Sequence, residues 1–127
     1  RDRYNDFENY INHRNNTSTT RKEDLTHRFY TLMMDNYREH KEVIFYADKL
    51  HVSSKYLSEV VKETSGKSPK DWIIDYSLLE IKELLKNSSL NIQEITIRTK
   101  FLNQSALGRF FKRHTNMSPS EYRESTY

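Results

Sequence analysis

Residues 54–72 (SKYLSEVVKETSGKSPKDW) and residues 103–122 (NQSALGRFFKRHTNMSPSEY) repeat one pattern of side chains. Each stretch starts with polar residues, continues through apolar residues at helical spacing, and closes on Ser-Pro and an aromatic residue. Matched residues are 50 positions apart, as are Leu57 and Leu107, Lys62 and Lys112, and Pro69 and Pro119. Upstream the separation falls to 49, between Val52 and Phe101, so the second copy holds one extra residue. Such a repeat predicts one structural unit built twice.

Each copy has the pattern of a helix-turn-helix, with a short helix, a tight turn and a longer helix that starts with polar residues. The first copy covers about residues 43–64 and the second about residues 92–115. Ser53 and Asn103 are expected to cap the longer helices, because their side-chain oxygens can accept the free backbone N–H groups of a first turn.

A long helix is predicted between the copies, from about residue 69 to residue 86. Its apolar residues form two stripes, Trp72-Tyr76-Leu79 and Ile74-Leu78-Ile81-Leu85. A helix that is apolar on two sides is normally buried on two sides. The chain has only 2 Gly and 2 Pro in 127 residues and no convincing strand pattern. The expected fold is therefore all-α, with two helix-turn-helix subdomains joined by a long linker helix and about seven helices after residue 20.

The first 20 residues are expected to form a separate region. Its apolar residues lie at helical spacing: Tyr4, Phe7, Tyr10 and Ile11. Residues 15–20 (NNTSTT) have the composition of a linker. Because the chain begins at Arg1 rather than Met, we expect it to be a piece of a longer protein, with residues 21–127 as its main domain here. No apolar run approaches the ~18 residues that span a bilayer, and no signal peptide is recognisable.

Charge separates the two copies. From Ile95 to Ser120 there is no acidic residue. Five basic residues lie in that stretch: Arg98, Lys100, Arg109, Lys112 and Arg113. In the first copy, from Ile44 to Glu63, lysines and acidic residues balance. A DNA duplex carries one charge per ~1.7 Å, so the acid-free stretch favours a nucleic-acid backbone as partner over a merely solvated face.

No catalytic or metal site stands out in the sequence. The 5 histidines form no i, i+4 pair and have no carboxylate at ligand spacing, so we expect neither a metal nor another cofactor. The absence of cysteine excludes disulfides, thiolate ligands and a cysteine nucleophile. There is also no Gly-rich phosphate loop and no set of nucleophile, base and orienting group, so no enzymatic activity is expected.

The two copies resemble the paired helix-turn-helix domain of AraC-type (AraC/XylS) bacterial transcription regulators. The first copy contributes ADKLHVSSKYLSEVVK and the second, more strongly, IQEITIRTKFLNQSALGRFFKRHTNMSPSEYR. The most specific positions are Ile95, Phe101, Gln104, Ser105, Arg109, Phe111, Lys112, Met117, Ser118, Pro119, Tyr122 and Arg123. The resemblance covers about residues 25–124. It implies that the helices at 54–64 and 104–115 enter successive segments of the major groove on one face of the DNA.

The resemblance also implies a role and partners. It implies sequence-specific binding of double-stranded DNA, transcription regulation in the cytoplasm, usually activation through RNA polymerase, and a possible homodimer through a missing N-terminal sensor domain. The sequence departs from the family pattern at Glu59, where Arg is common, and at His51 and Lys100, where Gly is frequent. Ala106 and Gly108 replace residues that are usually bulkier or hydroxylated. A helical protein-interaction module without DNA binding is the alternative.

Residues on the outward side of each recognition helix, near its start, can reach base edges. The expected DNA-binding residues are Ser54, Lys55, Ser58, Glu59 and Lys62 in the first copy, and Asn103, Gln104, Ser105, Gly108, Arg109, Lys112 and Arg113 in the second. Gln suits adenine, Arg and Lys suit guanine, and Glu suits cytosine. Lys62, Lys112 and Arg113 are expected on phosphate, which fixes register without reading sequence. For Gln104 and Arg109 the alternative is phosphate contact or plain exposure.

Two aromatic residues follow the Ser-Pro pairs, Trp72 in the first copy and Tyr122 in the second. Stacking on a base is one interpretation of such residues. Their recurrence at the same place in both copies favours a structural role, in which each packs beneath its helix-turn-helix.

Overall fold

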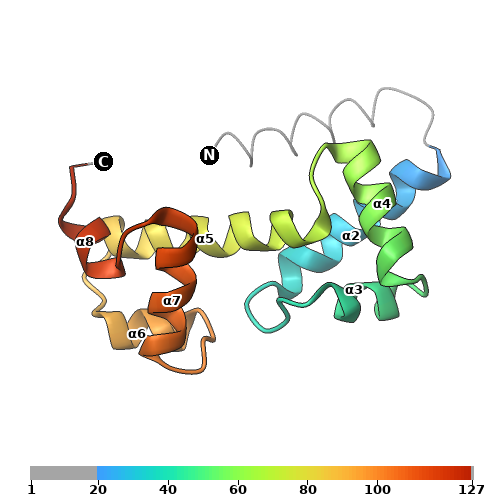
Figure 1. The fold of residues 1–127 in the computed structure, drawn as a ribbon. Coiled ribbons are helices and arrows are strands. Elements are labelled where there is room, and N and C mark those ends of the chain that lie inside the picture. The colour runs from blue at the N-terminus through green and yellow to red at the C-terminus, as the bar shows by residue number, and fades with distance from the viewer. Residues whose placement is uncertain (1–19, 127) are drawn as a thin grey trace. The chain divides into compact units, whose positions relative to one another are not determined.

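The structure is a computed structural model that describes residues 20–126 (Figure 1). Across that range the chain is helical, with no strand. The helices are α2 (Arg21–Asn36), α3 (Val43–Lys49), α4 (Ser54–Ser65), α5 (Pro69–Asn87), α6 (Ile92–Arg98), α7 (Gln104–Thr115) and α8 (Pro119–Glu124). The predicted all-α fold with two helix-turn-helix motifs, α3–α4 and α6–α7, is confirmed. The helix expected in residues 1–14 lies outside the described residues, as does the linker except for its last residue, Thr20, which caps α2.

The helices form two compact units, and the boundary between them falls inside α5, between Tyr76 and Ser77. The first unit contains, in chain order, α2, α3, α4 and the start of α5. The second unit contains, in chain order, the rest of α5, followed by α6, α7 and α8. Helix α5 is therefore the last helix of the first unit and also the first helix of the second.

Trp72 lies at the centre of the first unit, where its side chain is 0% exposed. Its indole Nε1 donates a hydrogen bond to the Ser65 hydroxyl at the end of α4, at 2.9 Å. The Lys67 ammonium nitrogen lies 3.8 Å from the centre of the indole ring and pairs with Asp75 at 3.2 Å. The other fully buried large side chains of this core are Phe29, Met33, Tyr46, Leu57, Val61 and Ile73. The predicted packing role of Trp72 is thus confirmed.

The second unit is closed by α8. The half-buried Tyr122 ring meets the buried Phe111 ring edge to face, with 5.4 Å between centroids. The guanidinium of Arg123 donates to the carbonyl oxygens of Leu85 at 2.8 Å and Leu84 at 3.2 Å. These carbonyls belong to the last turn of α5, which has no intrahelical donors left for them. Tyr122 therefore packs as predicted, and the signature residue Arg123 anchors α8 to α5.

The predicted stripes of α5 match its burial only in part. Ile73, which belonged to neither stripe, is 1% exposed, whereas Ile74 and Leu79 are half-buried. The reason is that α5 serves two cores in succession. Residues up to Tyr76 pack into the first unit and residues from Ser77 onward into the second, so no single stripe continues along the helix.

The turns of the two motifs share one backbone geometry. His51 and Lys100 have φ angles of 60° and 65°, in the left-handed region that favours glycine. The next residues, Val52 and Phe101, each donate a backbone hydrogen bond to the preceding short helix, at 3.0 Å and 3.2 Å. These pairs are 49 positions apart, but the residues that cap α4 and α7 are 50 apart. The extra residue of the second copy is therefore Leu102.

The departure from glycine at His51 should carry a measurable cost. A residue with a Cβ costs ~1–2 kcal/mol in the left-handed region. Glycine avoids this strain but loses more conformational entropy on folding, so only part of the strain energy is gained. We expect His51→Gly to raise the free energy of unfolding by about 0.5–1 kcal/mol in urea titrations followed by circular dichroism. The matched control is Lys49→Gly at the last residue of α3, which should lower it by up to about 1 kcal/mol. Equal effects of both changes would contradict the strain assigned to His51.

Candidate nucleic-acid interface

Helix α7 has one buried side and one basic outward side. Leu107 and Phe111 are fully buried. The outward positions are Gln104, Ser105, Gly108, Arg109, Lys112 and Arg113, all exposed except the half-buried Gly108. Because residues four apart lie on the same side of a helix, these positions form one continuous strip. The structure thus brings the predicted residues of the second copy together on one face.

Helix α4 presents the equivalent strip in the first unit. Leu57, Val60 and Val61 are buried beneath it. Its outward positions are Ser54, Lys55, Ser58, Glu59 and Lys62, of which the serines are half-buried and the others exposed. The predicted residues of the first copy therefore also share one face.

Both expected caps are formed. The Ser53 hydroxyl accepts a hydrogen bond from the backbone N–H of Tyr56 at 3.0 Å, and the Asn103 side-chain oxygen accepts one from Ala106 at 2.8 Å. The oxygen of Asn103 is thus engaged in holding the start of α7, which leaves its amide nitrogen as the group directed to other partners. The structure supports the capping interpretation of both residues.

Gln104 is held in place by a residue that sequence reasoning missed. Its amide nitrogen donates to the side-chain oxygen of Gln93 on α6, at 2.8 Å. The pairing leaves the second amide hydrogen and the oxygen of Gln104 for other partners, the two groups that a bidentate contact with adenine requires. No sequence signal pointed to Gln93, because both glutamines are exposed and 11 positions apart.

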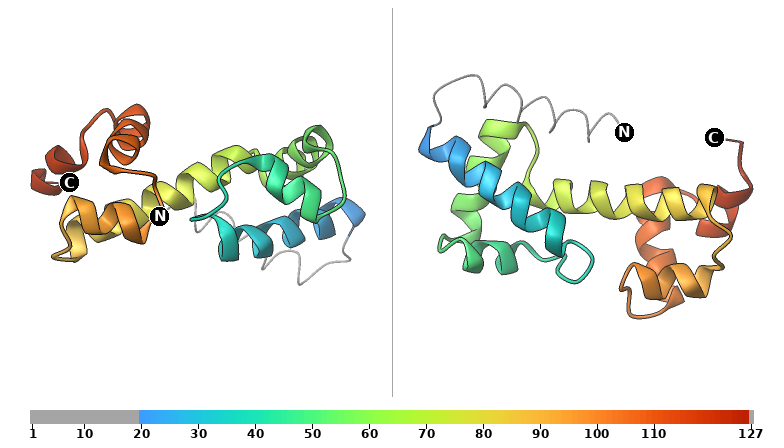
Figure 2. Two further views of the ribbon diagram at one scale, coloured as in Figure 1. Left: turned by 90° about the horizontal axis from the view of Figure 1, so that it is seen from below. Right: turned by 180° about the vertical axis from the view of Figure 1, so that it is seen from behind.

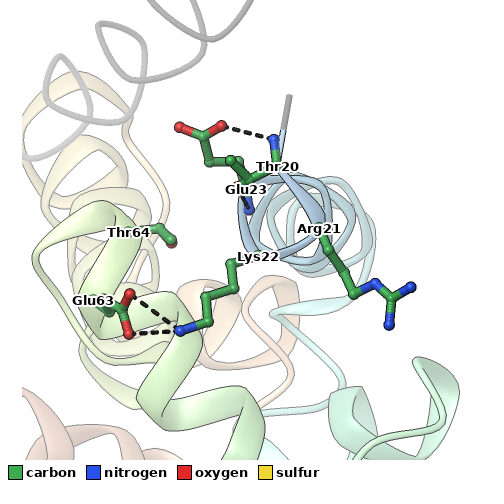
Figure 3. A pocket seen from close by; sticks show the side chains of 6 residues that line it. All are labelled: Thr20, Arg21, Lys22, Glu23, Glu63 and Thr64. Atoms are coloured by element: carbon green, nitrogen blue, oxygen red, sulfur yellow. Dashed lines mark hydrogen bonds and ion pairs between the residues drawn. The ribbon is translucent and has the colours of Figure 1, made fainter. Parts of the chain in front are cut away.

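Charge differs between helices α4 and α7 at matched positions. Glu59 and Glu63 of α4 correspond to Arg109 and Arg113 of α7, 50 positions later. Glu63 forms an ion pair with Lys22 of α2, at 3.2 Å, beside an open pocket between the start of α2 and the end of α4 (Figure 3). Both partners are about half-exposed, so the pair adds little to stability but neutralises Glu63.

Helix α2 also holds α4 by packing. The two helices lie side by side, as both views of Figure 2 show, and the hydroxyls of Thr26 and Thr64 share a hydrogen bond between them. Helix α2 therefore supports α4 and also neutralises Glu63, which lies next to Lys62 in the chain.

The basic cluster of α7 makes no ion pair within residues 20–126. Arg109, Lys112 and Arg113 are exposed there and form no hydrogen bond with a carboxylate of the described chain. Lys112 does act at longer range on Glu121 of α8. Hydrogen bonds with Ser118 lower the pKa of Glu121, and the charge of Lys112 lowers it further. In the same range no group of three or more His, Asp or Glu side chains is placed to hold a metal ion.

Gly108 lies in the middle of this basic strip, and apart from its chain neighbours and the nearby backbone of α7 no atom lies within 4 Å of where its Cβ would stand. We expect Gly108→Ala to stabilise the free protein by about 1 kcal/mol, because alanine has the higher helix propensity. The matched control is Gly66→Ala at the end of α4. There φ is +88°, and the change should destabilise by about 1–2 kcal/mol. Urea unfolding measures both effects. If Gly108→Ala destabilised the protein, the conclusion that a Cβ fits at this position would be wrong.

No helix within the described range, residues 20–126, is long and apolar enough to cross a membrane.

The chain is similar in sequence to known helix-turn-helix proteins. A family model described as a helix-turn-helix domain matches residues 46–125. The Msm operon regulatory protein of Streptococcus mutans is 31% identical over 78 residues, which are 61% of this chain and 28% of that protein. The chain spans about a third of the length of such curated relatives.

Solved structures share the fold as well. The C-terminal domain of AraT, a response regulator from Geobacillus stearothermophilus, superposes with a TM-score of 0.72 and 25% identity, over 85% of this chain and 93% of that one. The DNA-binding domain of AdpA, a global transcriptional factor solved with a target DNA, has a TM-score of 0.66 and 23% identity, over 77% and 88%. At that identity the second likeness concerns the fold alone.

Proposed function

Because the chain belongs to the AraC-type helix-turn-helix domain family, we propose that it binds specific sequences of double-stranded DNA through α4 and α7 and so regulates bacterial transcription. The observation that carries this proposal is the outward strip of α7. That strip is exposed and basic, no acid interrupts it in sequence, and it begins at the polar end of a recognition helix. Such a surface suits the phosphate backbone and the base edges that lie beside it.

We assign different tasks to the residues of α7. Gln104, oriented by Gln93, and Arg109 read bases, since their side chains suit adenine and guanine. Lys112 and Arg113, further along the helix, bind phosphate and fix its register. Ser105 and Gly108 lie between these groups, where small side chains allow a close approach.

Helix α4 carries the second half of the interface in this proposal. Lys55 and Glu59 read bases from its first turns, with the half-buried Ser54 and Ser58 beside them. Lys62, near the end of the helix, binds phosphate. Glu59 accepts a hydrogen bond from cytosine N4, and this contact adds discrimination rather than affinity.

The wider role also belongs to the proposal. Residues 1–20 connect to an N-terminal sensor and dimerisation domain, residues 43–64 and 92–115 are the two motifs, and residues 69–86 link them. The whole protein acts in the cytoplasm as an activator that engages RNA polymerase, as a homodimer formed through the N-terminal domain. The domain performs no catalysis. The names of relatives support activation, among them the lactose operon transcription activator of Staphylococcus xylosus.

A selection from random duplexes tests the function directly. We expect the 127-residue chain to enrich a defined sequence, and footprinting to show two protected major-groove segments about one helical turn apart. The control is Arg109→Glu combined with Lys112→Glu. It should enrich nothing, because the reversed charges repel phosphate, and it should still fold, because both positions of α7 are exposed. If the unmodified chain enriches no sequence, the chain is a protein-interaction module instead.

A further inference from the structure

Leu102 is the most exposed large apolar side chain in residues 20–126, with 92% of its surface accessible. It is also the one residue that the second motif has and the first lacks. The other exposed apolar side chains are less open: Ile97 at 64%, Ile44 at 56% and Tyr56 at 40%. A leucine inserted in a turn and left in water contributes nothing to the core, so its place in the chain calls for another explanation.

Leu102 directly precedes Asn103, the residue that caps the N-terminus of α7. An apolar residue at this position often packs on the fourth residue of the helix, here Leu107, and so fixes the entry of the chain. Leu107 is fully buried in the second unit, while Leu102 stays almost fully accessible, so this contact is largely unmade. The side chain remains available beside Gln104, at the end of the helix that approaches base edges.

We propose that Leu102 reads a thymine, through apolar contact with its C5-methyl group in the major groove, next to the base read by Gln104. The inference rests on the proposed function. It is favoured by the surroundings of the leucine, because Lys100, Asn103 and Gln104 are exposed and no acidic residue occurs from Ile95 to Ser120. An exposed apolar side chain with basic and amide side chains near it in sequence suits the major groove, where the thymine methyl lies among acceptors and phosphates.

The contact can be tested by removing one methyl group at a time. Each thymine of the selected duplex is replaced singly by deoxyuridine, which lacks only the C5-methyl, and the affinity of the 127-residue chain is measured. We expect one position at which the replacement weakens binding about three- to fivefold. In Leu102→Ala the same replacement should have no effect, and the thymine duplex should bind as the deoxyuridine duplex binds the unmodified chain.

Ile97→Ala is the matched control, because it shortens another exposed apolar side chain of the same unit. It should keep the full response to deoxyuridine. A methyl response that persists unchanged in Leu102→Ala, or that disappears equally in Ile97→Ala, overturns the assignment while leaving DNA binding intact. Absence of binding to any duplex defeats the proposed function itself. Thermal unfolding of both variants should match that of the unmodified chain, as expected for exposed positions.

Discussion

Replacing Lys112 and Arg113 together with glutamine is expected to weaken binding to the selected duplex about thirtyfold at 0.15 M salt. Both side chains are exposed on the outward strip of α7, and within residues 20–126 neither forms an ion pair. Each phosphate contact releases counterions and contributes ~0.9 to the slope of log K against log salt. The double variant should therefore lose about 1.8 from that slope, measured by fluorescence anisotropy between 0.05 and 0.3 M salt as rough limits.

The matched variant replaces Lys55 and Lys62 of α4 with glutamine, which removes the same charge from the first strip. We expect it to change the slope by less than half as much, because Glu59 shares that strip and lowers its potential for phosphate. The second motif would then supply most of the salt-dependent affinity and the first mainly discrimination. Equal changes of slope in the two variants would refute this division.

Replacing Trp72 with alanine is expected to lower the free energy of unfolding by about 3–5 kcal/mol. The side chain is fully buried, and its loss would leave a large cavity among the other core residues of the first unit. It would also remove the donor for the Ser65 hydroxyl and the ring beneath Lys67. Urea titration followed by circular dichroism is the appropriate measurement, since the chain has 1 Trp and fluorescence would be lost with it.

Trp72→Phe separates the two contributions. Phenylalanine keeps most of the apolar volume but cannot donate a hydrogen bond, so we expect a loss of about 1–2 kcal/mol. A Trp72→Ala variant that loses less than about 1 kcal/mol would mean that the indole is not a core residue, because such a value is ordinary for surface positions. Stacking of Trp72 on a base would then need to be considered again.

The local signals of this fold could be predicted because they depend on neighbours in sequence. Ser53 and Asn103 precede helical patterns with free N–H groups, and Pro69 and Pro119 suit a first helical turn. The repeat added the long-range information that local patterns lack. Equivalent residues recur at a separation of 49 or 50 positions, so the pattern of one motif predicts the other, together with the strip that each recognition helix exposes.

What could not be predicted depends on contacts between distant residues. The Gln93–Gln104 hydrogen bond joins two exposed polar side chains, and nothing in their spacing distinguishes them from solvated neighbours. The ion pair of Lys22 and Glu63 spans 41 positions and exists only because α2 packs on α4. The inserted position was visible in the sequence, but the exposure of Leu102 was not. An apolar side chain in a turn is usually predicted to be buried, but no other part of the described chain covers Leu102.

The division of α5 between two cores limits how segments of the chain could be exchanged. A breakpoint for genetic exchange normally falls in a loop, and loops lie before α5 at residues 66–68 and after it at residues 88–91. A crossover in the first loop would strip one unit of its closing helix, and one in the second loop would deprive the other unit of its opening helix. Exchange at either loop would therefore leave one unit without a helix of its core, whereas point substitutions can change each recognition strip and leave α5 intact.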